Sequence, residues 1–206
     1  MAATPTEAII DTSKLLGGLY CLDPREPEGW ALISSFGDLS LQAEWIYGDD
    51  FELDHINKLM HESIATDRQA LIREYQRLFI GPHHFNAPAW GSVYLDRDRV
   101  IFGSSTIELV QWMRANAITV NESERVPADH IGKMLLLLGW LAEEKPDLVG
   151  EYLAQHLMPW APRYLELLEA DAQNPFYKAL ALLTSLTLES ICLDLNVKPV
   201  KKQLFF

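Results

Sequence analysis

Apolar residues recur along this 206-residue chain at the three- and four-residue spacing of amphipathic helices. Clear examples cover residues 9–19, 56–64 and 71–79, where leucine, isoleucine and aromatic side chains return to one helical face. Alternation with period two, which is typical of half-buried strands, is rare. The best strand candidate, residues 93–102, is interrupted by a charged run at 96–99, so we expect irregular chain or short helical turns there. The pattern predicts an all-α fold.

Helix start and stop signals support the same fold class. The Gly-Pro pair at 81–82 is typical of a helix end, and Ser105 with Glu108 three residues later predicts a capping box for the next helix. The Asn-Pro pair at 174–175 supplies a cap and a first-turn proline before a long apolar run. These signals predict a single bundle of about eight to ten helices.

The chain offers no repeat, low-complexity linker or clear boundary, so we expect one helical domain over residues 1–206. Its middle holds an unusual segment, residues 81–104, with the sequence GPHHFNAPAWGSVYLDRDRVIFGS. Long loops in compact domains are usually functional or disordered, and disordered segments are poor in aromatic residues. The segment is therefore a candidate for function.

The composition and net charge of the chain limit the kinds of partner that it can bind. Hydrophobic residues make up 49% of the chain, which is enough for a sizeable core, and the formal net charge is -12. Such a charge repels nucleic acids and anionic lipid surfaces and attracts cationic partners. The first ten residues lack the pattern of a signal peptide, and no apolar run reaches 18 residues, so we expect a cytoplasmic protein without stable membrane insertion.

Asp129 and His130 stand directly before the apolar run 131–144 and suggest an enzyme, a helix cap, or a polar clamp at an apolar groove. Two histidines at i and i+4 can bind a metal, but position 134 is Met, and the adjacent His83 and His84 cannot readily converge. The chain also lacks the G-x-S-x-G, P-loop and G-x-G-x-x-G motifs. We expect no metal, cofactor or catalytic residue, and the pattern alone favours a cap.

Three blocks, taken in order and spacing, give a stronger indication. The sequences YQRLFIGP (75–82), PAWGSVYLDRDRVIFGSST (88–106) and PADHIGKMLLLLGWLAEE (127–144) resemble the TorD/DmsD family of redox-enzyme maturation chaperones, and its DmsD branch most closely. The Pro-Trp pair at 159–160 and the sequence NPFYKAL at 174–180 are also similar to that branch.

This resemblance implies an all-helical cytoplasmic chaperone without enzymatic activity. Its partner would be the twin-arginine leader peptide of a molybdoenzyme precursor, typically the catalytic subunit of a dimethyl sulfoxide reductase. The chaperone would hold the leader for folding and cofactor loading before Tat export, with components of the Tat translocase as further partners. Matching motifs assign peptide binding to Tyr75, Leu78, Phe79, Pro88, Trp90, Tyr94, Arg97, Asp129 and His130.

The chain departs from the family pattern at four positions. Close relatives have tryptophan at positions 75, 83 and 94, and a proline at position 89. Physical chemistry agrees with the implied role, because an aromatic groove can bury apolar leader side chains and Asp129 can accept a bidentate guanidinium. Two alternatives stay open: a nucleotide-binding switch or hydrolase that uses Asp129 and His130, and a general helical interaction module.

Overall fold

The computed structural model describes residues 5–82, 84–119 and 126–206, and within these ranges it contains helices and no strand. The α-helices are α1 (Pro5–Cys21), α2 (Pro27–Ser35), α3 (Leu41–Glu44), α4 (Asp50–Thr66), α5 (Arg68–Tyr75), α6 (Gly91–Leu95), α7 (Ser104–Ala115), α8 (Ile131–Glu144), α9 (Val149–Tyr152), α10 (Ala161–Asp171) and α11 (Pro175–Asp194). Two π-helical turns, η1 (Gln76–Ile80) and η3 (Leu153–Leu157), continue α5 and α9, and the 3-10 turn η2 (Pro146–Leu148) precedes α9. The all-α prediction is confirmed.

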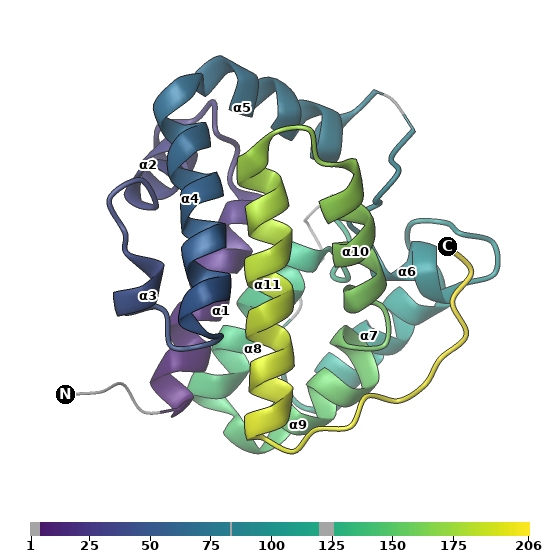
Figure 1. Cartoon of the computed structure of the whole chain (residues 1–206). Helices are drawn as coiled ribbons and strands as arrows, with labels where there is room; N and C mark the ends of the chain where they lie inside the picture. Colours follow the sequence, from purple (N-terminus) through teal and green to yellow (C-terminus); the bar gives the residue numbers. More distant parts are fainter. Residues whose placement is uncertain (1–4, 83, 120–125) are drawn as a thin grey trace.

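The long helices pack around one apolar core (Figure 1). Helix α11 lies between α4 and α10, and α1 packs along α8. Helix α11 is long and apolar enough to cross a membrane, but 61% of its most apolar window is buried inside the protein. Its apolarity is therefore explained by its place in the core.

Glycine allows α1 and α8 to approach closely. A Cβ atom at Gly132 would lie 2.5 Å from Sγ of Cys21 and 3.0 Å from the Gly17 carbonyl oxygen. Reciprocally, a Cβ atom at Gly17 would lie 2.9 Å from the Gly132 carbonyl oxygen. Because real Cβ atoms do not approach so closely, this contact requires glycine and allows the start of α8 to lie directly against α1.

Two of the expected helix signals act as predicted. The helix formed by α5 and η1 ends at Ile80, directly before the Gly-Pro pair. The Asn174 side chain accepts a hydrogen bond from the Phe176 amide at 2.9 Å, and so it caps α11.

The expected capping box of Ser105 and Glu108 is wrong. Helix α7 begins at Ser104, and its cap residue, Gly103, has no side chain to accept a hydrogen bond. The carboxylate of Asp96 replaces it, accepting hydrogen bonds from the Ser105 amide and from both serine hydroxyls. The cap therefore comes from the preceding loop, where periodicity gives no signal.

Candidate functional site

The Asp-His pair lies against the aromatic segment of residues 81–104. Trp90 and His130 form an isolated antiparallel bridge, and their rings meet edge to face with centroids 5.6 Å apart. The Gly91 amide donates to the Asp129 carbonyl at 3.1 Å, and the Ile131 amide donates to the Ala89 carbonyl at 2.8 Å. Backbone pairing thus joins two blocks that are distant in sequence.

Asp129 is almost fully buried, with 3% of its surface exposed. Its Oδ2 accepts a hydrogen bond of 2.7 Å from the Ser92 amide, in the first turn of α6. Helix α8 begins at Ile131, because residues 129–131 pair with the aromatic segment. The carboxylate therefore caps α6, and not the apolar helix that follows it in sequence.

His130 is the cap residue of α8. Its Nδ1 accepts a hydrogen bond from the Gly132 amide at 3.2 Å, so the neutral ring carries its proton on Nε2. Burial, reinforced by the positive charge of Lys133, lowers the pKa of His130 to about 4. At neutral pH the ring is uncharged, and each member of the pair binds a separate backbone amide.

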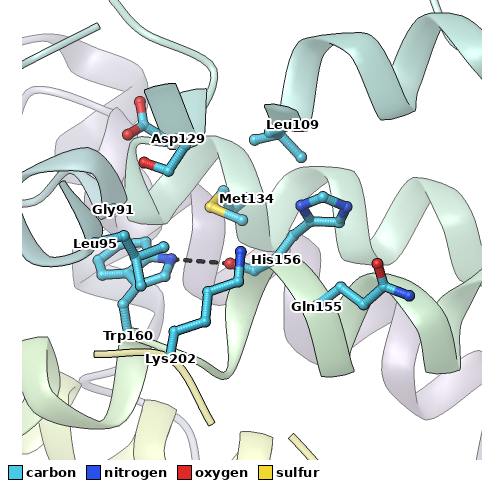
Figure 2. A pocket seen from close by; sticks show the side chains of 10 residues that line it. Gly91, Leu95, Leu109, Asp129, Met134, Gln155, His156, Trp160 and Lys202 are labelled. Atoms are coloured by element: carbon cyan, nitrogen blue, oxygen red, sulfur yellow. Dashed lines mark hydrogen bonds between the residues drawn. The ribbon is translucent and has the colours of Figure 1, made fainter. Parts of the chain in front are cut away.

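A small cavity of about 10 Å³ opens beside this pair, with space for about one water molecule. Figure 2 shows Asp129, Met134, His156, Trp160 and Lys202 around it. The Trp160 indole donates to the carbonyl of His156 at 3.1 Å. Burial, together with the charge of Lys202, lowers the pKa of His156 to about 4, so this second histidine is also neutral at pH 7.

Unpartnered polar atoms occur on α6 and its flank and on two residues of the cavity wall, Asp129 and His156. Within the described ranges, the buried side-chain atoms that lack a hydrogen-bond partner include Trp90 Nε1, Ser92 Oγ, Tyr94 Oη, Asp129 Oδ1 and His156 Nε2. Most buried polar groups in proteins are hydrogen-bonded, so a local group of exceptions needs an explanation. These atoms offer both donors and acceptors to a polar ligand.

Three residues assigned by resemblance lie in the core, away from Trp90. Tyr75, Leu78 and Phe79 are 4–7% exposed. The rings of Tyr75 and Phe79 pack on each other and on Tyr177. Their part in peptide binding stays a prediction, and their contacts are those of residues that support the fold.

The other assigned residues lie near the pair or on α6 and its flanks. Pro88 is buried directly before Ala89, whose carbonyl accepts from Ile131. Tyr94 is fully buried and stacks on Trp160 at 5.5 Å, while Arg97 is exposed just beyond α6. Position 83, where relatives have tryptophan, lies outside the described residues.

Sequence reasoning missed the contributions of Lys202 and His156 to the cavity wall. Lys202 belongs to a short basic run near the end of the chain, and no motif links it to Asp129. The Pro-Trp pair at 159–160 was the available signal, since Trp160 forms one side of the cavity. Among the residues with described positions, no three His, Cys, Asp or Glu side chains are grouped as a metal site would require.

Comparisons with known proteins place the chain in a family. Residues 48–166 match the family described as nitrate reductase delta subunit. The chain is 37% identical over 195 residues to the Tat proofreading chaperone DmsD of Salmonella typhi, covering 94% of each protein. It is 30% identical over 123 residues to the chaperone protein TorD of Ferrimonas balearica, covering 57% of this chain and 56% of TorD.

A solved structure supports the same fold. The crystal structure of a candidate redox enzyme maturation protein from Archaeoglobus fulgidus superposes with a TM-score of 0.52 over 91% of this chain and 96% of that one, at 18% identity. The DmsD match, which covers 94% of the chain, carries the assignment further. This chain belongs to the nitrate reductase delta subunit family and, within it, to the TorD/DmsD group of redox-enzyme maturation chaperones.

Proposed function

We propose that this protein is a redox-enzyme maturation chaperone that binds the twin-arginine leader of a molybdoenzyme precursor. Relatives named as Tat proofreading chaperones support the coarser role, which involves no catalysis. We further propose that the precursor is a catalytic subunit like that of dimethyl sulfoxide reductase. The chaperone would hold it in the cytoplasm for folding and cofactor loading, and would then meet the Tat translocase.

The observation that carries the proposal is the group of unpartnered polar atoms around Trp90 and Asp129. An arginine side chain supplies several N–H donors, and the peptide backbone supplies both donors and acceptors. Asp129 Oδ1 can accept from a leader guanidinium, and Trp90 Nε1 can donate to a leader carbonyl. A bound leader would thus satisfy atoms that the folded chain leaves without partners.

Apolar surface for the rest of a leader lies close by on α7. This helix contributes Ser105 and Leu109 to the small cavity, and Thr106, Ile107 and Val110 to an open pocket of about 280 Å³. Two exposed apolar side chains, Phe102 and Ile107, line that pocket, and the exposed Val100 and Ile101 directly precede Phe102 in sequence. An exposed apolar patch next to buried charge matches a leader whose basic start is followed by an apolar stretch.

The free energies of the contacts indicate that apolar contacts and charge have different roles in leader binding. Burying three or four apolar leader side chains yields about 1.5–3 kcal/mol each, against association and ordering costs of about 4–15 kcal/mol. Apolar contact therefore sets most of the affinity. The acidic surface, with a net charge of -12, speeds the encounter with a cationic leader, and Asp129 supplies specificity.

Calorimetry with synthetic leaders tests the proposal. The peptides carry either Arg-Arg or Lys-Lys in an otherwise identical dimethyl sulfoxide reductase leader, and the proteins are wild type and Asp129→Asn. Because only guanidinium forms a bidentate pair, the wild type should prefer Arg-Arg by about 1–3 kcal/mol and the variant should show much less preference. Equal preference by both proteins would remove Asp129 from leader recognition, and absence of binding to either would refute the proposed function.

A further inference from the structure

The last ten residues, 197–206, form an extended segment that returns across the helices. In Figure 1 this segment leaves the end of α11, passes α9 and ends beside α6. It is anchored at its start, where the Val197 amide donates to the Cys192 carbonyl at 2.8 Å. At its end the Phe206 ring packs edge-on against Tyr94, with centroids 5.4 Å apart. We call residues 197–206 the return segment.

Backbone hydrogen bonds hold the return segment to two helices. The Val200 amide donates to the Ala154 carbonyl at 2.9 Å, and the Phe205 amide donates to the Tyr94 carbonyl at 2.8 Å. The Ala154 carbonyl lacks a helical donor, because the Met158 amide bonds to Leu153 and residue 159 is proline. Tyr94 is next to the last residue of α6, so its carbonyl also lies beyond that helix's own amides.

These two carbonyls are therefore acceptors for an extended peptide. Such contacts involve only the backbone, so a peptide of another sequence can make them equally well. Val200 and Leu204 remain 46% and 38% exposed, so the apolar contacts of the return segment lie mainly at its two ends, at Val197 and Phe206. The surface beneath the segment is thus suited to exchange one extended chain for another.

Lys202 places a positive charge over the small cavity. Its side chain extends between Trp160 and His156 and lines the same cavity as Asp129 (Figure 2). Its ammonium group lies 3.5 Å from Glu108 Oε2, a partly exposed pair that contributes little to stability. With about 10 Å³ of space left, a guanidinium cannot enter until Lys202 withdraws.

The sequence of the return segment has the chemistry that the proposed ligand needs. Two adjacent cations, Lys201 and Lys202, are followed by Gln203 and then by the apolar run Leu204, Phe205 and Phe206. A twin-arginine leader likewise has adjacent cations before an apolar stretch. We propose that the return segment occupies the leader-binding surface and that an incoming leader displaces it, an inference that rests on the proposed function.

Physical chemistry favours replacement of the return segment by a leader. Lysine offers a single hydrated point charge, whereas arginine offers a planar fork that fits a carboxylate with two hydrogen bonds. The tethered segment has a high effective concentration but poorer contacts, so it protects the buried carboxylate until a better ligand arrives. The apparent leader affinity is then reduced by the fraction of molecules in which the segment is bound.

A double variant, Phe205→Ser with Phe206→Ser, tests the exchange in the full chain. Loss of the Tyr94 contact should free the surface, and the variant should bind a labelled Arg-Arg dimethyl sulfoxide reductase leader about three- to tenfold more tightly than the wild type. Hydrogen exchange supplies a second measurement. Saturating leader should speed exchange of the Val200 and Phe205 amides in the wild type, because displacement breaks their hydrogen bonds.

Phe51→Ser is the matched control, since Phe51 is an aromatic residue of α4 with 83% of its surface exposed. It should bind leader with wild-type affinity, and circular dichroism confirms that all variants fold. Wild-type affinity in the double variant, together with unchanged protection of both amides at saturation, would overturn the displacement while leaving the proposed function intact. If no protein bound leader, both proposals would fall.

Discussion

Two buried carboxylates in this protein have opposite surroundings. Glu74 accepts two hydrogen bonds of 2.9 Å from the Arg77 guanidinium and one of 2.6 Å from the Gln173 amide. Arg77 in turn donates to Asp171 at 2.7 Å. Burial opposes ionisation of Glu74, but these bonds outweigh it and hold its pKa below the ordinary value.

Asp129 is buried to a similar degree, but its side chain accepts from the Ser92 amide through Oδ2, and its Oδ1 has no partner in the described part of the chain. A carboxylate with a full set of partners stabilises a fold, because each lone pair has a donor. A buried carboxylate with an open oxygen stabilises less and retains capacity for a ligand. The number of hydrogen-bond partners of a buried carboxylate therefore distinguishes a structural site from a binding site more clearly than its burial does.

Removing Glu74, the carboxylate with a full set of partners, should have the largest effect on stability. Glu74→Ala leaves the Arg77 charge with Asp171 as its remaining acidic partner and removes the acceptor for two backbone amides, so we expect a loss of about 3 kcal/mol in unfolding free energy. Urea unfolding measures it. Glu166→Ala breaks the exposed pair with Arg163 and should cost under about 1 kcal/mol. Equal losses would show that the complete network stabilises no more than a surface pair.

Trp90→Ala should act on binding, and not mainly on the fold. Trp90 is half-buried, carries an unpartnered Nε1, and packs on Phe85 at 5.9 Å and on His130. As an aromatic anchor it should cost about 2 kcal/mol of leader affinity when removed. Calorimetry measures this loss, and Trp30→Ala on α2 is the control for loss of a tryptophan outside the proposed site. Unchanged affinity in a folded Trp90 variant would make it a packing residue.

Acid should weaken the fold through His130. Its pKa is about 4 when folded and about 6.5 when unfolded, so the unfolded chain binds more protons between these values. Stability is therefore fully present above about pH 6.5 and falls as pH drops toward 4, by about 1 kcal/mol between pH 7.5 and 5.5. His130→Asn keeps a capping side chain and should lose this part of the pH dependence. An identical dependence in both proteins would contradict the assignment.

Asp129→Asn gives the smallest effect on stability. The amide oxygen can still accept from Ser92, so we expect a loss below about 1 kcal/mol in urea unfolding, far less than for Glu74→Ala. The comparison of the two carboxylates would fail if Asp129→Asn destabilised the protein as much as Glu74→Ala does.

Local patterns allowed much of the fold to be predicted. Apolar periodicity gave the long helices, and the Asn-Pro pair gave the start of α11 because capping involves neighbours in sequence. The very short helices α3 and α9, with four residues each, are too short to show a period.

The site could be predicted only in part. The Asp-His pair and Trp90 came from motif resemblance, but the partner of Asp129 is the amide of residue 92, 37 positions away. Lys202 is further still from Asp129 in sequence, and no local rule brings them to one cavity. The cap that Asp96 provides for α7 could not be predicted for the same reason. Asp96 reaches the Ser105 amide only because the loop between them folds back on the start of α7.

The close contact between Gly17 and Gly132 limits how far the recognition surface can be moved to another protein. Asp129 and His130 are held where α8 starts, and the close contact at Gly17 and Gly132 sets how α1 lies against that end of α8. The family match begins at residue 48 and leaves α1 out. A graft limited to residues 48–166 would therefore carry the recognition residues but lose the helix that aligns them. Successful transplantation would need a substitute for α1 with an equally small residue at the crossing.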